Sequence, residues 1–280
     1  MKQESMSKPS ISVILSTYNQ PDWLQKVLWG YAAQTYTDFE VVIADDGSNS
    51  DTADLINSMI PGLPYPVQHV WHEDNGFQKT IILNKAIKAS KADYLLFSDG
   101  DCVPRADFVG VHAQYKEQGY FLSGGYFKLP MNISEAITEK DIKLQNCFDL
   151  NWLKKQGLKS SFKNNKLTKS PFKQKFLNWI TPTEATWNGH NSSGFKSDIV
   201  AANGFDERMQ YGGEDRELGE RLFNAGIKAK QLRYTAICVH LDHPRGYVKP
   251  EMLTKNAAIR KATKEQKLTK TAYGLEPLKS

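Results

Sequence analysis

The sequence has few cysteines and no hydrophobic run long enough to cross a membrane. Its three cysteines, Cys102, Cys147 and Cys238, form no Cys-x-x-Cys pair. This spacing gives no indication of a zinc site or a redox couple, so we expect reduced, structural thiols. No apolar stretch approaches the roughly 18 residues that span a bilayer, and the N-terminus lacks the apolar core of a signal peptide. We therefore expect a globular protein that stays in the cytosol.

Acidic residues are absent from one long segment, residues 150–183. Eight lysines occupy it: Lys154, Lys155, Lys159, Lys163, Lys166, Lys169, Lys173 and Lys175. Five large aromatics accompany them: Trp152, Phe162, Phe172, Phe176 and Trp179. The segment is either a solvated insertion or a surface for an anionic membrane or an acidic polymer. No recognised nucleic-acid-binding signature accompanies the lysines, so we expect no nucleic-acid partner.

The first hundred residues alternate between short apolar runs and helical patterns. The apolar runs predict strands over 11–15, 39–44 and 67–71 and from 94 onward, and the helical spacing predicts helices over 21–31, 55–59 and 81–87. This order is typical of an α/β fold with a mostly parallel, Rossmann-like sheet and flanking helices. With 280 residues, of which 40% are hydrophobic, we expect one continuous domain followed by a basic helical tail.

Two aspartates follow the last of these apolar runs. Asp99 and Asp101 are separated by Gly100. In an extended segment, positions i and i+2 point the same way, so both carboxylates would face one hard divalent cation. An ordinary strand-ending turn accounts for the same residues. In open α/β sheets ligands bind beyond the carboxyl ends of the strands, where the residues near 17–19, 45–46 and 99–101 would converge.

A second acidic pair, Glu214 and Asp215, begins a predicted helix directly after Gly212 and Gly213. Acids in a first helical turn oppose the helix dipole favourably, which is a sufficient structural reason for both. The glycines allow the backbone to approach a ligand closely, so a carboxylate here is also a candidate general base. Both interpretations stay open on the sequence.

Several short motifs occur in a fixed order. They are Ser16-Thr17-Tyr18-Asn19, Asp45-Asp46-Gly47-Ser48, Asn75-Gly76, Asn84-Lys85-Ala86, Asp99-Gly100-Asp101, Gly189-His190-Asn191, Gly204-Phe205-Asp206-Glu207, Gly212-Gly213-Glu214-Asp215 and His240 to Arg245. The first five resemble the nucleotide-binding half of the family 2 glycosyltransferases, which have the GT-A fold. The later motifs resemble the galactosyltransferase-type C-terminal region of bacterial polysaccharide synthases such as the chondroitin polymerases.

The resemblance implies an organisation and an activity. One GT-A domain would cover 1–245, with a nucleotide-binding part at 10–103 and an acceptor-binding part at 104–245 that contains the lysine-rich insertion 150–183; a tail would cover 246–280. The activity would be inverting, metal-dependent transfer of a hexose or N-acetylhexosamine from a UDP-sugar to a glycan or lipid-linked acceptor, in bacterial surface polysaccharide synthesis. Such an enzyme would be cytoplasmic, with a peripheral contact at the inner face of the membrane.

Two other classes remain as alternatives. A sugar-nucleotide nucleotidyltransferase also combines an α/β sheet with a carboxylate-bound metal, but its glycine-rich N-terminal loop is not found in Ser16-Thr17-Tyr18-Asn19. A degenerate relative that only binds glycans would not need the two acidic pairs. Their joint presence favours an enzyme.

The resemblance also assigns roles to residues. The nucleotide would contact Thr17, Tyr18, Asn19, Asp45, Asp46, Lys79, Asp99 and Gly100. A carboxylate after a strand can accept the imide N–H of uracil, which we assign first to Asp46 and then to Asp45, although a turn opening the next helix explains both. Mn²⁺ or Mg²⁺ would be held by Asp99 and Asp101, with a further ligand from His240 or His243, since imidazole suits Mn²⁺ better than Mg²⁺.

The remaining assignments concern catalysis and the sugars. Asp215 would be the general base and Glu214 would hydrogen-bond the acceptor. The donor or acceptor sugar would contact Trp187, Asn188, His190, Asn191, Tyr211 and Gly213. Trp187 and Tyr211 are equally interpreted as stacking on a sugar ring or as core anchors.

Overall fold

The computed structural model describes residues 8–244 and 249–276. Its strands are β1 (Ile11–Thr17), β2 (Phe39–Asp45), β3 (Val67–Trp71), β4 (Tyr94–Asp99), β5 (Cys102–Pro104), β6 (Tyr120–Lys128), β7 (Ser192–Phe195) and β8 (Lys228–His240). Its α-helices are α1 (Pro21–Ala32), α2 (Ser50–Met59), α3 (Lys79–Ala89), α4 (Phe108–Tyr115), α5 (Met131–Ala136), α6 (Glu139–Lys143), α7 (Leu150–Lys155), α8 (Pro171–Ile180), α9 (Lys196–Ala201), α10 (Glu214–Asn224) and α11 (Pro250–Glu265). The predicted strands and helices of the first hundred residues are confirmed.

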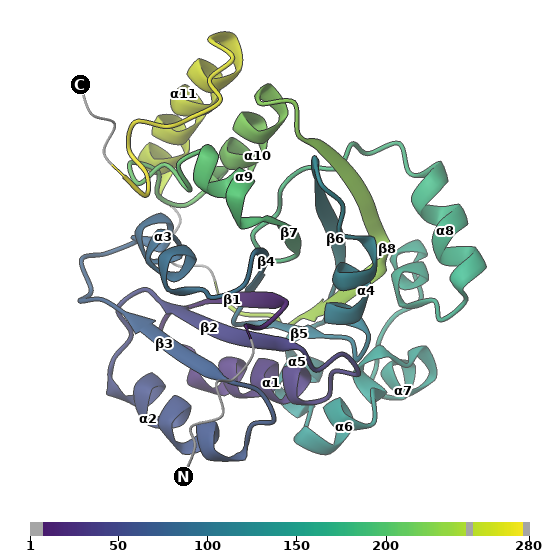
Figure 1. The fold of residues 1–280 in the computed structure, drawn as a ribbon. Helices are drawn as coiled ribbons and strands as arrows, with labels where there is room; N and C mark the ends of the chain where they lie inside the picture. The colour runs from purple at the N-terminus through teal and green to yellow at the C-terminus, as the bar shows by residue number, and fades with distance from the viewer. Residues whose placement is uncertain (1–7, 245–248, 277–280) are drawn as a thin grey trace.

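The eight strands form one sheet in the order β3-β2-β1-β4-β7-β6-β8-β5. β3, β2, β1 and β4 are parallel, and β6 is parallel to β8, whereas β7 and β5 pair antiparallel with their neighbours. The sheet curls, as Figure 1 shows, and β5 packs against α1. A Cβ on Gly30 of α1 would come within 2.6 Å of Pro104 on β5, so only glycine permits this approach. The predicted α/β fold with a mostly parallel sheet is confirmed.

Helices cover both faces of the sheet (Figure 1). Alternate residues of β1 separate the two faces: Ile14 packs with the helices α3, α9 and α10, while Val13 and Leu15 pack with α1. This alternation buries nearly every side chain of the central strands. The polar residues that follow the strands are therefore the ones left at the carboxyl edge.

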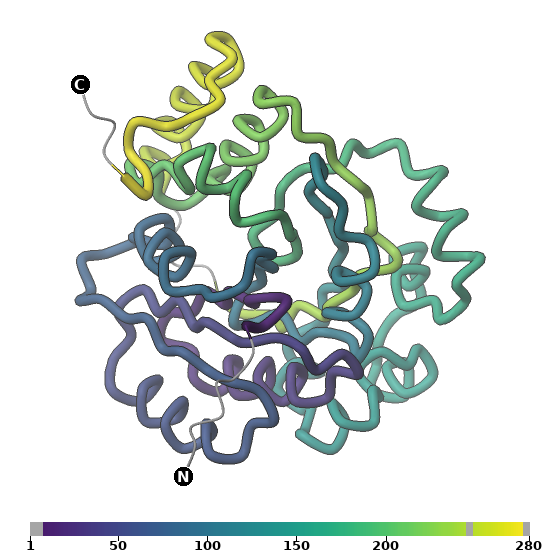
Figure 2. Tube along the Cα trace, in the orientation of Figure 1, coloured from purple at the N-terminus to yellow at the C-terminus, as the bar shows by residue number. Residues whose placement is uncertain are grey.

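The segment predicted as a tail packs on the domain as far as it is described. Arg245 and the boundary at 245–246 lie outside the described residues. In Figure 2 the yellow C-terminal segment lies against the green segment that contains α9 and α10. Leu275 joins the core beneath α3, and Asn203 donates to the carbonyls of Thr271 and Glu276. No helix within the described residues is long and apolar enough to cross a membrane.

Candidate active site

A cleft of about 760 Å³ opens beyond the carboxyl ends of β1 and β4, a volume suited to a nucleotide-sized ligand. It brings together most of the residues that the sequence predicted. Those lining it are Thr17, Tyr18, Asn19, Asp46, Lys79, Asp99, Gly100, Asp101, His190, Tyr211, Glu214, Asp215, His240 and His243. Residues more than 200 positions apart thus share one cavity.

Asp46 is the carboxylate of its pair that faces the cleft. Its Oδ2 accepts a hydrogen bond from the backbone N–H of Gln78 at 3.0 Å, and its Oδ1 lies 2.9 Å from His72 Nε2. Burial raises the pKa of Asp46, and His72 opposes this. Asp45 lies outside the cleft, 2.9 Å from His69 Nε2, and accepts from the backbone N–H of Ser48. Asp45 therefore shapes the turn, and Asp46 is positioned for a ligand.

Lys79 and Asp99 form a largely buried ion pair on the floor of the cleft. Lys79 Nζ lies 2.8 Å from Asp99 Oδ1, which also accepts from the hydroxyl of Ser16 at 2.6 Å. Burial alone would raise the pKa of Asp99, but Lys79 and Ser16 outweigh it and lower the pKa well below its usual range. Burial alone would lower the pKa of the Lys79 ammonium group. The negative charges of Asp99, Asp215 and Glu214 outweigh burial and raise this pKa. Asp99 is therefore held as an anion.

The chain turns between the two aspartates of the 99–101 motif, so the extended geometry expected from the sequence is wrong. β4 ends at Asp99, and β5 begins at Cys102. The N–H of Gly100 donates to the carbonyl of Ser16 at 2.7 Å, and a Cβ at Gly100 would lie 3.0 Å from that oxygen. After this turn, Asp101 lies beside the histidines at and after the end of β8.

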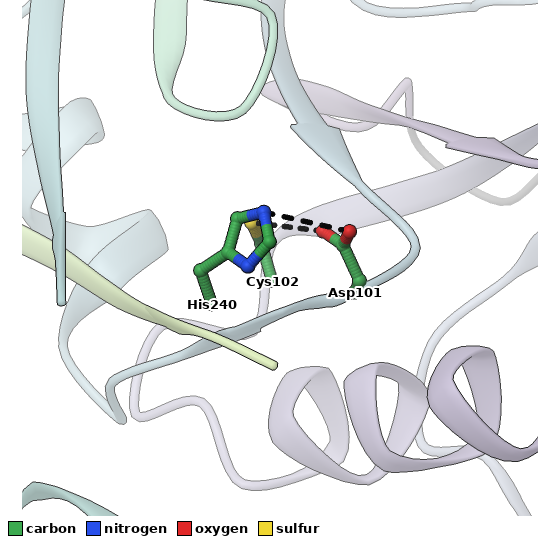
Figure 3. A group of neighbouring side chains, drawn as sticks. All are labelled: Asp101, Cys102 and His240. Atoms are coloured by element: carbon green, nitrogen blue, oxygen red, sulfur yellow. Dashed lines mark hydrogen bonds and ion pairs between the residues drawn. The ribbon is translucent and has the colours of Figure 1, made fainter. Parts of the chain in front are cut away.

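Asp101 meets two histidines at the end of β8. Its Oδ2 lies 2.9 Å from His243 Nε2 and 3.6 Å from His240 Nε2, and the two imidazoles stack with ring centroids 5.6 Å apart. Figure 3 shows His240 and Cys102 converging on the Asp101 carboxylate. One ligand atom each from Asp101, Cys102 and His240 lie within 4.8 Å of one another. Both histidines that the sequence offered for this site are present in it.

The donor set at Asp101 fits a divalent transition metal. A carboxylate and two imidazoles are ligands that Mn²⁺ accepts. The buried Nδ1 of His240 has no hydrogen-bond partner among the described residues, so this ring is not fixed by a second contact on that side. Burial and the neighbouring Cys238 raise the pKa of Cys102 well above its ordinary value, and its thiol donates to Asp101 Oδ1. Cys102 is thus a neutral thiol in this structure, and its sulfur lies among the atoms that could hold an ion.

Glu214 and Asp215 open α10 and line the same cleft. Glu214 Oε2 accepts from the N–H of Gly212 at 2.8 Å, while the buried Oδ1 of Asp215 has no partner within the described ranges. Burial, then repulsion from Asp215, raises the pKa of Glu214 to about 7. Burial also raises the pKa of Asp215, against the attraction of Lys79. A Cβ at Gly189 would lie 2.6 Å from Asp215 Oδ2, so glycine is required there.

Two rings occupy the wall between the acidic pairs. His190 and Tyr126 meet edge to face with centroids 4.6 Å apart, and both line the cleft. Burial lowers the pKa of His190 to about 4, so the imidazole is neutral at pH 7. A neutral ring offers one donor and one acceptor to a sugar hydroxyl.

Of the six residues assigned to sugar binding, Tyr211 and His190 line the cleft and the other four do not. Trp187 is fully buried and packs on Phe97 and Phe121 at 5.5 Å, which settles its place as a core anchor. The side-chain amide of Asn191 donates to the carbonyls of Gly125 and Ala236. Gly213 is the N-cap of α10, and Asn188 donates to Ser123.

Several residues of the site were not found from the sequence. His72 and Tyr126 were missed, as was Lys128, which lines the cleft and pairs with Asp242 at 2.8 Å. Ser16 was included in a motif but was given no role, although it hydrogen-bonds Asp99. The others depend on contacts between distant segments and carry no local signal.

The C-terminal helix holds the loop before the acidic pair. Asn256 of α11 is completely buried. Its side-chain amide donates to the carbonyls of residues 210, 211 and 212 at 2.8–3.2 Å. One side chain thus fixes three successive peptide groups of the segment that enters α10.

The chain matches two protein families. Residues 12–167 match the family described as Glycosyl transferase family 2, and residues 178–244 match the one described as N-terminal domain of galactosyltransferase. Among curated relatives, the hyaluronan synthase of Pasteurella multocida is 28% identical over 240 residues, which is 77% of this chain and 23% of the synthase. The chain spans 23% to 65% of the lengths of the first three such relatives.

Solved structures agree on the fold. Residues 1–349 of TarS from S. aureus, in complex with UDP-GlcNAc, superpose with a TM-score of 0.59 at 16% identity; the match covers 92% of this chain and 69% of the chain in that structure. A mannosyltransferase from Pyrobaculum calidifontis, in complex with GDP-Man and Mn²⁺, gives 0.55 at 19% identity and covers 86% and 59%. Since one family match extends over more than half of the sequence, the chain belongs to glycosyl transferase family 2.

Proposed function

We propose that this glycosyltransferase moves a hexose or N-acetylhexosamine from a UDP-sugar to a glycan or lipid-linked acceptor, with inversion, in bacterial surface polysaccharide synthesis. The observation that carries the proposal is the presence of two acidic sites in one cleft. The first contains Asp99, Asp101, His240 of β8 and His243 after it, and the second contains Glu214 and Asp215. The hyaluronan synthase relative supports the polymer context.

The nucleotide would lie at the first of these sites. Asp46, at the carboxyl end of β2, is placed to accept the imide N–H of a base, and Thr17 and Asn19 line the same region. Lys79 supplies a positive charge beside the position of a diphosphate. Asp101, His240 and His243 would hold Mn²⁺ or Mg²⁺, which when bound neutralises the diphosphate and stabilises the charge that develops as UDP departs.

The acceptor would lie at the second site. The unpartnered Oδ1 of Asp215 takes the proton of the acceptor hydroxyl as its oxygen bonds to the anomeric carbon. The bond from that carbon to the UDP oxygen breaks in the same step, so one displacement inverts the anomeric configuration. Glu214 accepts a hydrogen bond from the acceptor, and His190 and Tyr211 contact the sugars.

A thermal-shift panel tests the donor. The full chain is heated with UDP, GDP, their hexose and N-acetylhexosamine derivatives, and each with Mn²⁺ or with a chelator. A ligand that binds only the native state raises the midpoint by mass action. We expect UDP-sugars to raise it with Mn²⁺ and much less with chelator. Stabilisation by GDP-sugars alone would contradict the uridine assignment, and no response to any nucleotide sugar would contradict the transferase role.

A second measurement separates transfer from binding. UDP release is followed with the stabilising donor and a panel of oligosaccharide acceptors, and the product is analysed by NMR for its anomeric configuration. An inverted linkage is expected. Retention would exclude the single displacement by Asp215.

A further inference from the structure

The outer face of α8 exposes a stripe of large apolar side chains. Phe172 is 82% exposed and Trp179 is 80% exposed, and Phe176 and Ile180 lie on the same surface at 48% and 46%. The opposite face carries Leu177 and holds the helix on the domain. In Figure 1, α8 lies at the outer edge of the molecule, far from α11. A soluble domain seldom leaves such a continuous stripe uncovered.

Lysines flank this stripe on both sides. With about 100° between successive helical residues, Phe172, Phe176, Trp179 and Ile180 fall within one arc of α8. Lys173 and Lys175 lie at the two borders of that arc, and both are exposed. Lysine stems can lie along an apolar surface while their ammonium groups reach a polar layer, so this order suits an interface between water and hydrocarbon.

The surrounding segment is strongly cationic. Of its eight lysines, Lys169 alone has a carboxylate partner in the part of the chain that the structure describes, Asp149 at 3.4 Å. The stretch 168–177, which includes most of α8, also lies between the two family matches and is covered by neither. Phe172, Lys173, Lys175 and Phe176 therefore lie outside both matches, whereas Trp179 and Ile180 lie at the start of the later one.

We propose that this face of α8, the surface formed by Phe172, Phe176, Trp179 and Ile180 with Lys173 and Lys175, docks on a bilayer that contains anionic lipid. Amphipathic helices with aromatic and basic residues in this arrangement lie in the plane of the membrane interface. The centre of a protein–protein interface is depleted of lysine, and a hydrated acidic polymer offers no apolar depth for four hydrophobic side chains. This inference does not depend on the proposed function.

The lysine-rich segment that contains the docking surface also contacts a residue of the cleft. Lys166, from the same segment, donates to the carbonyl of Tyr126 at 2.8 Å, and its ammonium lies 4.8 Å from the centre of the Tyr126 ring. Tyr126 lines the cleft. A membrane-bound α8 would thus hold the cleft at a defined distance from the lipid surface, which suits an acceptor anchored in that surface.

Vesicle flotation with the full chain tests the proposal. Wild-type protein is mixed with vesicles of phosphatidylcholine alone or of phosphatidylcholine with phosphatidylglycerol. We expect binding to the anionic vesicles that weakens with added salt. Phe172→Ser with Trp179→Ser should reduce binding at least about tenfold, and Lys173→Glu with Lys175→Glu should reduce it about fivefold per lysine.

Matched variants on other surfaces serve as controls. Val200→Ser removes an exposed apolar side chain from α9, and Lys255→Glu with Lys270→Glu reverses charges on the C-terminal segment; both should bind as the wild type does. Equal thermal midpoints would show that every variant is folded. Full binding by the α8 double variant would overturn the proposal. The proposal would also be overturned if the wild type does not bind vesicles and instead forms a dimer, or binds an acidic polysaccharide, through these same aromatics.

Discussion

Asp99 of the first acidic pair in the cleft and both residues of the second pair are the same kind of side chain in opposite electrostatic states. At the end of β4, Asp99 is surrounded by Lys79 and Ser16, and its pKa is lowered. At the start of α10, Glu214 and Asp215 are buried beside each other, and their pKa values are raised. A carboxylate held as an anion suits the binding of cations, and one that retains affinity for protons suits proton transfer. The surroundings therefore separate the roles.

Removing the proton acceptor is the largest test of this contrast. Asp215→Asn should lower kcat by about 10²–10⁴, because the amide cannot take the acceptor proton. Binding of UDP with Mn²⁺ should change little, as calorimetry would show. Asp198→Asn is the matched control, since Asp198 is a carboxyl with a raised pKa on α9, away from the cleft. Wild-type turnover by Asp215→Asn would refute the base assignment.

Removing a proposed cation ligand should weaken the binding of UDP, whereas removing the proton acceptor lowers turnover. Asp101→Ala should weaken UDP binding in Mn²⁺ by at least about tenfold, which is about 1.4 kcal/mol, and leave the weak binding measured in chelator unchanged. Cys102→Ser should retain Mn²⁺-dependent binding, because carboxylate and imidazole groups are the ligands that we expect for Mn²⁺. Calorimetric titrations with UDP check both variants. An equal loss of Mn²⁺-dependent UDP binding in both variants would identify the Cys102 sulfur as a ligand.

The ion pair on the cleft floor contributes to stability. Lys79→Met leaves Asp99 without its cation and should lower the free energy of unfolding by about 2–3 kcal/mol at pH 8. Because the pKa of Asp99 is lowered in the folded state, this contribution is present above the ordinary carboxyl pKa and is lost as the pH falls toward the folded value. Urea unfolding at several pH values should therefore show the difference shrinking in acid.

A second substitution checks the origin of that loss. Adding Asp99→Asn to Lys79→Met removes the unpaired charge and should recover part of the stability. No recovery would mean that Lys79 acts through packing.

The smallest effect concerns Glu214. Its pKa is raised from 4.5 to about 7, so the folded state holds a proton that the unfolded chain has lost, and the group's unfavourable contribution grows between these two pH values. Glu214→Gln should therefore be more stable than the wild type at pH 8, by about 1–2 kcal/mol, and equal to it below about pH 4.5. Urea unfolding measures this difference. A constant difference at all pH values would locate the effect in hydrogen bonding and not in charge.

Local patterns in the sequence were sufficient for the first half of the fold. The strands β1 to β4 have strong apolar runs, and α1 to α3 have clear helical spacing, so their positions were predicted. β6 was not predicted, because Gly124 and Gly125 interrupt it at a register shift. Side chains are excluded there: a Cβ on Gly124 would overlap Asn191, and one on Gly125 would overlap the carbonyl of Arg233.

The site was predictable as a set of residues but not as a geometry. Motif order indicated that Asp101 and His243 belong together, although 142 positions separate them, from 101 to 243. The partner of Asp46 was not indicated, because the pairing with His72 follows from the register of β2 and β3. Likewise, only the folded chain shows that the motif turns between the end of β4 at Asp99 and the start of β5 at Cys102. Long-range pairing decides these contacts, and no local pattern encodes it.

The buried Asn256 bears on where this protein can be divided. Both family matches end before it, the later one at residue 244. Yet its three hydrogen bonds hold the peptide groups that lead into α10. A fragment cut at the limit of sequence similarity would keep every acidic residue of the cleft and lose the support that positions two of them. The functional unit of this chain therefore extends beyond the region by which its ancestry is recognised.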